Sequence, residues 1–167
     1  MIIVEYEWSS DGDHNAIEDW ATRFLCHLDE SLFDTPLKDA ALNGSKYVNI
    51  KIRHNNSDGM IGYCHGDDEE AWIELDETLI GDEDYFKETL AHELVHAKQL
   101  LKGELKDSEG FKTIWKGEEY INLRGKLPEA VYKALPWEVE AYTRQNEHKI
   151  VPHEPFFWPF SGEYKAL

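Results

Sequence analysis

A string of five residues constrains this chain more than any other part of its sequence. His92, Glu93 and His96 stand in the pattern HELVH, within the run Thr89 to Gln99. Residues four apart on a helix lie one turn apart on the same face, so both imidazoles can reach a single ion. Glu93 lies beside that face, where a carboxylate can reach a water on the ion without binding the ion. This is the spacing of a zinc peptidase, with His92 and His96 as ligands and Glu93 as general base.

The residues around HELVH predict an amphipathic helix of about twenty residues. Asp82 or Asp84 would cap its first turn, and Gly103 marks its end. The alternative is an ordinary amphipathic helix whose two histidines bind nothing. Lys98 and Gln99 follow the motif directly, and we expect both on the solvated rim. Apolar side chains recur at spacings of three and four beside the histidines, at Phe86, Leu90, Leu94, Ala97 and Leu101.

Composition favours one acidic domain formed by residues 1–167. Hydrophobic residues make up 41% of the chain, which suffices for one core. The net charge of −17 opposes contact with phosphate backbones and anionic lipids, so we expect no nucleic acid and no membrane as partner. We expect no signal peptide and no membrane span, because no apolar run is long enough. The two cysteines, Cys26 and Cys64, are expected to be reduced thiols. The expected protein is a cytoplasmic monomer that acts on a peptide or protein substrate.

The pattern before the motif predicts a small mixed sheet backed by a helix. Residues 2–8 favour a strand, and a helical period runs from a cap at Asp13 to Phe33. A helix of this length near the start of a domain usually packs against a sheet.

Three further strands are predicted before the motif helix. Alternation over 46–54 indicates a strand, and a turn at 55–59 would join it to 60–65 as a hairpin. Residues 71–75 form the last strand. A sheet placed here would let a substrate chain lie along its exposed edge above the metal.

The chain after the motif helix predicts a loop-rich region and two short helices. Residues 104–120 have no clear period, and we expect a connection with a short hairpin that borders the site. Pro128 and Pro136 each open a helix, the second running over 137–148. The aromatic, proline-rich tail, 151–167, is expected to pack on the domain.

A catalytic zinc site needs a third protein ligand, and the chain offers two carboxylates for it. No histidine follows His96 within thirty residues, and Lys102 stands six residues after it. The helix that Pro136 opens carries Glu138 and Glu140. Two residues apart on a helix means nearly opposite faces, so only one of the two can bind.

The motif helix and the later glutamates resemble a known group of enzymes. An HExxH helix followed by an ExEA-type helix resembles the gluzincin zinc metallopeptidases, in particular the minigluzincin and ImmA/IrrE-like groups. HELVHAKQ together with PWEVEAY is also similar to small metallopeptidase-like proteins of tailed phages, for which the compartment would be the host cytoplasm. The resemblance covers residues 85–145. It implies an α+β, zincin-like fold, with an N-terminal helix and small mixed sheet packed on the HExxH helix and a second helix that bears a ligand.

The resemblance also orders the two candidate glutamates. In such families the ligand lies in an E-x-x-A-[DN] frame, and matching Ala141 selects Glu138 as the third zinc ligand. The rival frame, in which the ligand directly precedes alanine as in thermolysin, would select Glu140. The first frame is favoured. Tyr142 stands where that frame has an acidic or amide residue, so the resemblance leaves the hydrogen-bond partner of the two histidines open.

The reaction that the resemblance implies is hydrolysis of a peptide bond by a zinc-activated water. Glu93 would take the proton of that water and later deliver it to the leaving amine. The donor to the oxyanion is left open among Tyr120, Tyr132, Tyr142 and His148. The other function class is a non-catalytic zincin-fold module that binds metal or a protein partner, as a regulator or an inhibitor. Glu93 favours catalysis, because a binding module has no use for that carboxylate.

Overall fold

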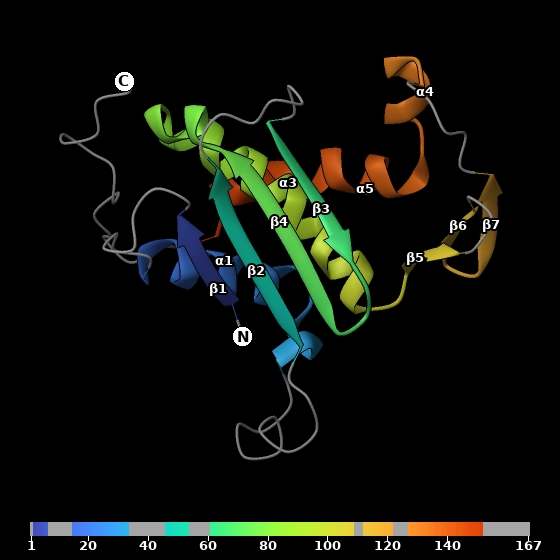
Figure 1. The fold of residues 1–167 in the computed structure, drawn as a ribbon, viewed down its shortest axis with the longest axis horizontal. Coiled ribbons are helices and arrows are strands. Elements are labelled where there is room, and N and C mark those ends of the chain that lie inside the picture. Colours follow the sequence, from blue (N-terminus) through green and yellow to red (C-terminus); the bar gives the residue numbers. More distant parts are fainter. Residues whose placement is uncertain are drawn as a thin grey trace.

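Helices and two sheets make up the described part of the chain (Figure 1). The computed structural model describes residues 2–6, 15–33, 46–53, 61–108, 112–121 and 127–151. The elements are, in chain order, β1 (Ile2–Tyr6), α1 (Asn15–Leu28), the 3-10 helix η1 (Glu30–Phe33), β2 (Tyr47–Arg53), β3 (Gly62–Gly66), β4 (Glu70–Asp76), the 3-10 helix η2 (Glu77–Gly81), α3 (Glu83–Leu101), β5 (Leu105–Ser108), β6 (Lys112–Trp115), β7 (Glu118–Ile121), α4 (Glu129–Lys133), α5 (Pro136–Arg144) and the 3-10 helix η3 (Gln145–Lys149).

The larger sheet has the strand order β1-β2-β4-β3. β1, β2 and β4 run parallel, and β3 runs antiparallel to β4. The side chains of β2 and β4 alternate between buried and more exposed positions, as half-buried strands do. The register sets the buried residues of the two strands side by side, with Val48 opposite Ala71, Ile50 opposite Ile73 and Ile52 opposite Leu75.

The predicted hairpin between residues 46–54 and 60–65 is wrong. β2 pairs with β1 and β4, and β3 pairs only with β4 among the described strands. A central position suits β2, because its buried apolar residues lie beside those of β4. β3 has partly exposed or exposed side chains throughout, which suits an edge. Residues 54–60, including the predicted turn, lie outside the described residues.

The hairpin that does form joins β3 to β4 through a tight turn. Gly66 has φ +143, and a Cβ there would lie 2.1 Å from the carbonyl oxygen of Glu70. Only glycine fits this turn without strain. Oδ1 of Asp67 accepts hydrogen bonds from the backbone N–H groups of Glu69 and Glu70. These local contacts favour pairing of β3 with the strand that follows it.

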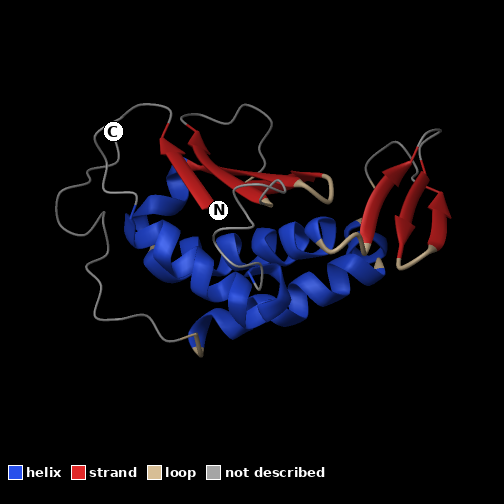
Figure 2. Ribbon diagram, turned by 90° about the horizontal axis from the view of Figure 1, so that it is seen from below, coloured by secondary structure: helices blue, strands red, loops and turns tan. Residues whose placement is uncertain are grey.

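α3 is the element against which most others pack. It contacts β3 and β4 on one side, α1 beside them, and α5 and η3 on another side. Figure 2 shows the larger sheet as one layer and the helices as the layer beneath it. The core lies between these layers and is built from the inner sheet residues, α1 and α3. From α1 it takes Ile17, Trp20, Ala21, Phe24, Leu25 and Leu28.

Both ends of α3 have the signals that the sequence predicted. Oδ1 of Asp82 accepts a hydrogen bond from the backbone N–H of Tyr85, so Asp82 is the N-cap. Gly103 follows the helix with φ +70, a left-handed conformation that often ends helices. The predicted apolar stripe, from Phe86 to Leu101, is buried.

The remaining elements follow the predictions with shifted boundaries. The strand predicted at 2–8 is β1, and the helix predicted to reach Phe33 ends as α1 at Leu28, with η1 after it. The region expected to hold a short hairpin contains three antiparallel strands, β5-β6-β7. Pro136 opens α5, as predicted. The predicted cap Asp13 and all of the tail beyond Val151 lie outside the described residues.

Candidate metal centre

The two motif histidines project from one face of α3, as their spacing predicts. Their ring centroids are 4.9 Å apart and the rings meet edge to face. His96 and Glu93 are 8% and 6% exposed, so both polar side chains are buried in the helix layer. Because a buried polar group is costly without partners, the surroundings of these side chains decide what the site can do.

Glu138 on α5 faces both histidines. Its Oε2 lies 3.2 Å from Nε2 of His92, and its Oε1 lies 3.2 Å from Nε2 of His96. Pro136 at the start of α5 places Glu138 in the first turn of that helix, and the side chain is 4% exposed. Ligand atoms of the three residues all lie within 4.8 Å of one another. Two segments more than forty residues apart in sequence therefore converge on one point.

Glu140, the rival candidate, faces away from the histidines. Its Oε1 accepts hydrogen bonds from Nζ of Lys98 at 2.9 Å and from Nε2 of Gln99 at 3.0 Å. Lys98 also pairs with Glu104 at 3.1 Å. The expectation of a solvated rim is therefore wrong, since Lys98 and Gln99 are only 5% and 0% exposed. Both lie under α5, where Glu140 gives them a partner.

The charges around the histidines reinforce one another. Burial alone would raise the pKa of Glu138, but His92, His96 and Tyr132 beside it outweigh burial and lower the pKa to about 2. Burial alone would lower the pKa of His96, but the carboxylates of Glu138 and Glu93 raise it. Burial also raises the pKa of Glu93, and the nearby histidines only partly offset that effect. The site thus holds an anionic ligand candidate and a carboxyl group with enhanced basicity.

The donor set fits a zinc ion. Two imidazole nitrogens and one carboxylate oxygen are a frequent protein contribution to catalytic zinc, which keeps a further position for water. Oε2 of Glu138 is buried and forms no hydrogen bond with any described protein group, although Nε2 of His92 is near. A buried acceptor without a donor needs another partner. A metal ion between the three side chains would be that partner.

A known family covers most of the site. The family model described as the SprT-like family matches residues 22–124, more than half of the chain. The chain belongs to the SprT-like family. This family is related to the zincin metallopeptidases and is typically associated with zinc. The match includes His92, Glu93 and His96 and ends before Glu138. Comparison with curated proteins gave no match, and comparison with solved structures gave none either.

The family assignment agrees with the metallopeptidase class that the sequence suggested. The described part of this SprT-like chain also has the expected α+β composition, with the sheet and α1 packed on α3 and with α5 following. None of the described helices is both long enough and apolar enough to span a bilayer.

The four oxyanion candidates of this SprT-like chain lie in different places. Tyr132 on α4 has its hydroxyl hydrogen-bonded to Glu138, and burial together with the charges of Glu138 and Glu93 raises its pKa. The ring of Tyr142 packs edge to face on His92, with centroids 4.6 Å apart. The two remaining candidates, Tyr120 and His148, lie elsewhere.

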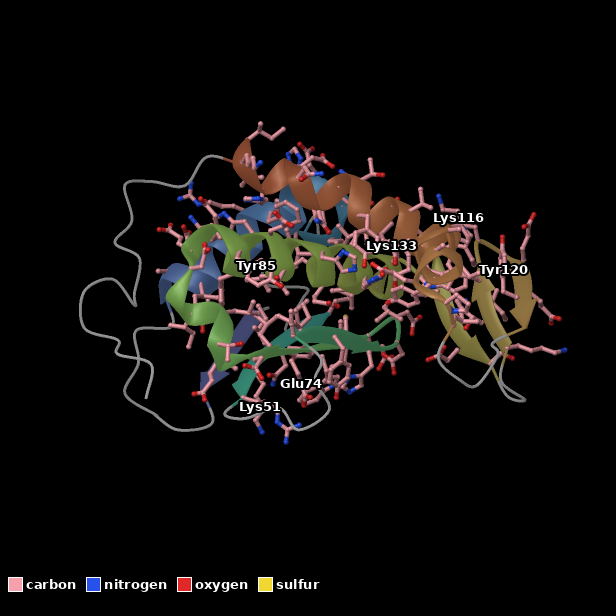
Figure 3. The ribbon with its side chains drawn as sticks, turned by 90° about the horizontal axis from the view of Figure 1, so that it is seen from above. Lys51, Glu74, Tyr85, Lys116, Tyr120 and Lys133 are labelled. Carbon is pink, nitrogen blue, oxygen red and sulfur yellow. The ribbon has the colours of Figure 1, made fainter. Side chains whose placement is uncertain are left out.

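Tyr120 and His148 have other surroundings. Tyr120 packs on Trp137, with ring centroids 5.4 Å apart. Figure 3 shows Tyr120 on the small sheet, at the opposite end of the molecule from Tyr85 at the start of α3. His148 is 5% exposed, and the charged groups that act on it are Asp84, Lys87, Glu88 and Lys149.

The sequence did not reveal the residues that contact the Nδ1 atoms of the two histidines. Nδ1 of His96 lies 2.8 Å from Oε1 of Gln99, and Nδ1 of His92 lies 2.8 Å from Oε1 of Gln145. The spacing of three between His96 and Gln99 on one helix was a usable signal. Gln145 gave none, because only the packing of η3 on α3 brings it to His92. The small residue Gly62 also escaped notice, and it lies against Glu93.

Proposed function

We propose that this protein is a zinc-dependent metallopeptidase of the gluzincin type. The observation that supports this most directly is the convergence of His92, His96 and Glu138 beside the buried Glu93. Nitrogen ligands with one carboxylate favour zinc among the common metals. The resemblance to minigluzincins and ImmA/IrrE-like proteins agrees with a glutamate ligand on a later helix.

The four residues of the site would act as metal ligands and as a general base. His92, His96 and Glu138 would hold zinc, which supplies Lewis-acid chemistry that makes water nucleophilic near neutral pH. Glu93 takes a proton from the water as its oxygen attacks the peptide carbonyl carbon. When the carbon–nitrogen bond breaks, Glu93 gives that proton to the leaving amine. A base works best when its pKa lies near the operating pH, and burial moves the pKa of Glu93 in that direction.

The hydroxyl of Tyr132 is the best-supported donor to the oxyanion. It lies near the carboxylates of Glu138 and Glu93, on a helix next to the one that carries Glu138. A phenol with a raised pKa stays protonated at neutral pH and can donate a hydrogen bond. Tyr142 is the second choice, because its ring packs on His92.

An extended peptide is the substrate that the surroundings favour. Among the described strands, β3 lies at an edge of the larger sheet, and it packs beside α3. A free strand edge offers backbone N–H and C=O groups to an extended chain. Gly62 at the start of β3 lies next to Glu93, so a chain paired there would pass the proposed base. The monomer, the peptide substrate and the absence of nucleic-acid partners remain proposals from sequence.

The test begins with metal content. We expect about one zinc per chain by elemental mass spectrometry, and loss of that zinc in His96→Ala. Glu93→Gln should bind zinc normally and cleave a peptide library, followed by mass spectrometry, about 10²- to 10⁴-fold more slowly. Wild-type protein that binds zinc but cleaves nothing would favour the non-catalytic regulator or inhibitor. Absence of zinc after metal addition would leave HELVH without a metal role.

A further inference from the structure

Each motif histidine makes a matching contact on the side away from Glu138. Nδ1 of His96 lies 2.8 Å from Oε1 of Gln99, and Nδ1 of His92 lies 2.8 Å from Oε1 of Gln145. The chain contains no other glutamine. Both glutamines of the protein therefore place an amide oxygen beside a histidine Nδ1, one from α3 and one from η3.

Carboxylates behind the amides fix which way each amide points. Nε2 of Gln145 donates to Oε1 of Glu88 at 3.1 Å. Nε2 of Gln99 donates to Oε1 of Glu140 at 3.0 Å and to the backbone oxygen of Trp137 at 2.9 Å. Carboxylate and carbonyl oxygens only accept hydrogen bonds at neutral pH. The NH₂ end of each amide must therefore face these acceptors, which leaves the amide oxygen to face the histidine.

An amide oxygen in turn fixes the histidine. Because it only accepts, the facing Nδ1 must carry a proton. Nε2 of each neutral ring is then left with a lone pair, and Nε2 is the atom that faces Glu138 in both residues. A zinc-bound histidine usually donates its other N–H directly to a carboxylate, a backbone carbonyl or water. Here a neutral amide stands between the imidazole and the carboxylate.

We propose that Gln99 and Gln145 are positioning residues that hold His96 and His92 in the Nδ1-protonated form for metal binding, and that Glu140 and Glu88 act through them. This inference rests on the proposed metal site. It gives Glu140 a positioning role in place of the ligand role that its sequence position offered. Lys98, which also pairs with Glu140, holds that carboxylate in place.

The interposed amides keep the two carboxylates one residue away from the rings. A carboxylate directly on each Nδ1 would bring negative charge closer to the ion and weaken its pull on water. With Glu138 already an anionic ligand candidate, neutral acceptors limit the negative charge around the ion. The same contacts tie the ligand rings to α5 and η3, since Gln99 reaches Trp137 and Gln145 begins η3.

The experiment uses Co²⁺ as a probe of the full-length protein. Protons on the Nδ1 atoms of cobalt-bound histidines give strongly shifted NMR signals that disappear in D₂O. Wild-type protein should show two such signals, because each Nδ1 proton is held in a hydrogen bond to an amide oxygen. In Gln145→Met and Gln99→Met one signal each should be lost, and Co²⁺ affinity measured by chelator competition should fall about 10- to 100-fold. Asn146→Ala, an exposed amide next to Gln145, is the control and should keep both signals.

A double variant that exchanges the amide at 145 with the carboxylate at 88 distinguishes a positioning role of Gln145 from a role in packing alone. Gln145→Glu alone sets a carboxylate against Glu88 and should weaken Co²⁺ binding. Gln145→Glu with Glu88→Gln reverses the order of amide and carboxylate, so that the new carboxylate accepts from both His92 and the new amide. We expect this pair to show both signals and to bring Co²⁺ affinity within about threefold of the wild type.

The outcomes are distinct. Unchanged signals and affinity in both methionine variants would overturn the positioning role. A double variant no better than Gln145→Glu would overturn the orienting role of Glu88. Wild-type protein that binds no Co²⁺ or Zn²⁺ would overturn the metal site itself, and the inference with it.

Discussion

Buried polar side chains on α3 are the feature that distinguishes this helix at the level of single residues. Glu93, His96, Lys98 and Gln99 are each no more than 8% exposed. A buried charge without partners is strongly destabilising, so such residues persist where the fold satisfies them. Lys98 and Gln99 both donate hydrogen bonds to the carboxylate of Glu140. Gln99 also forms the hydrogen bond with Nδ1 of His96. Glu138 is the acid of α5 that remains as the candidate metal ligand.

Replacement of Glu138 or of Glu140 by glutamine should therefore have unequal effects on Zn²⁺ affinity. Glu138→Gln removes the proposed ligand and should weaken Zn²⁺ binding by roughly 100-fold or more. Glu140→Gln alters the partner of Gln99 and Lys98 but no proposed ligand, and should weaken Zn²⁺ binding about tenfold or less. Chelator competition on both variants measures this. Each removes one carboxylate from the same helix, so one is the control for the other. The reverse order would assign the ligand role to Glu140.

Gly62 offers a second single-residue test. A Cβ at this position would lie 3.1 Å from Cδ2 of Leu75, 3.2 Å from Cγ2 of Thr89 and 3.4 Å from Cγ of Glu93. Gly62→Ala should displace the Glu93 side chain slightly and lower kcat/KM by about tenfold, with zinc content unchanged. Gly81→Ala is the control, because a Cβ there meets nothing within 4 Å. Equal activity in both variants would argue against a fixed position of Glu93.

At the level of elements, α1 and the segment after α5 are joined by a small charged cluster. Oε1 of Glu147 on η3 lies 2.8 Å from Nε2 of His27 on α1. Oε2 of the same carboxylate lies 2.9 Å from Nε of Arg144, and Arg144 also reaches the backbone oxygen of Leu28 at 3.4 Å. Because Gln145 and its contact with His92 lie in the same segment, this cluster helps to set the position of η3.

The contribution of Glu147 in this charged cluster to stability should fall at acid pH. Burial alone would raise the pKa of Glu147, but Arg144 and His27 outweigh it and lower the pKa. A carboxyl group with a lowered pKa in the folded state stabilises above its unfolded pKa, and that stability is lost as pH falls through the folded pKa. Glu147→Gln should therefore reduce the free energy of unfolding by about 0.5–1 kcal/mol at pH 7, and the difference should be smaller at pH 3. Urea unfolding at both pH values measures it, and a difference that does not depend on pH would contradict it.

At the level of the whole molecule, the proposed metal site connects parts of the chain that are distant in sequence. α3 supplies two ligand candidates and α5 supplies the third. An ion that binds only when both helices are in place stabilises the folded state by its binding free energy. The larger sheet and α1 also pack on α3, away from this joining of α3 and α5.

Metal loading should therefore raise the melting temperature. With free Zn²⁺ at about 1,000 times its dissociation constant, the added stability is about 4 kcal/mol. For a chain of this size that corresponds to a rise of about 10 °C, measured by calorimetry and reversed by chelator. His96→Ala should show little change on adding Zn²⁺. An equal rise in that variant would indicate that metal binds elsewhere.

The sequence alone determined α3 and the face that carries its chemistry. The period of its apolar residues, the cap at Asp82 and the stop at Gly103 act over single turns, so they are readable without the rest of the chain. The spacing of His92 and His96 is a property of one helix. For the same reason Pro136 marked the start of α5 correctly.

Tertiary structure decided what depends on how distant elements pack. Helix geometry alone does not distinguish Glu138 from Glu140, and the resemblance only favours Glu138. When α5 lies on α3, Glu138 faces the histidines while Glu140 meets Lys98. The pairing of β2 with β4 joined apolar faces that local turn signals did not predict. Gln145 reached His92 because η3 packs on α3. Each of these contacts joins residues far apart in sequence, and burial and hydrogen bonding across the interface select them.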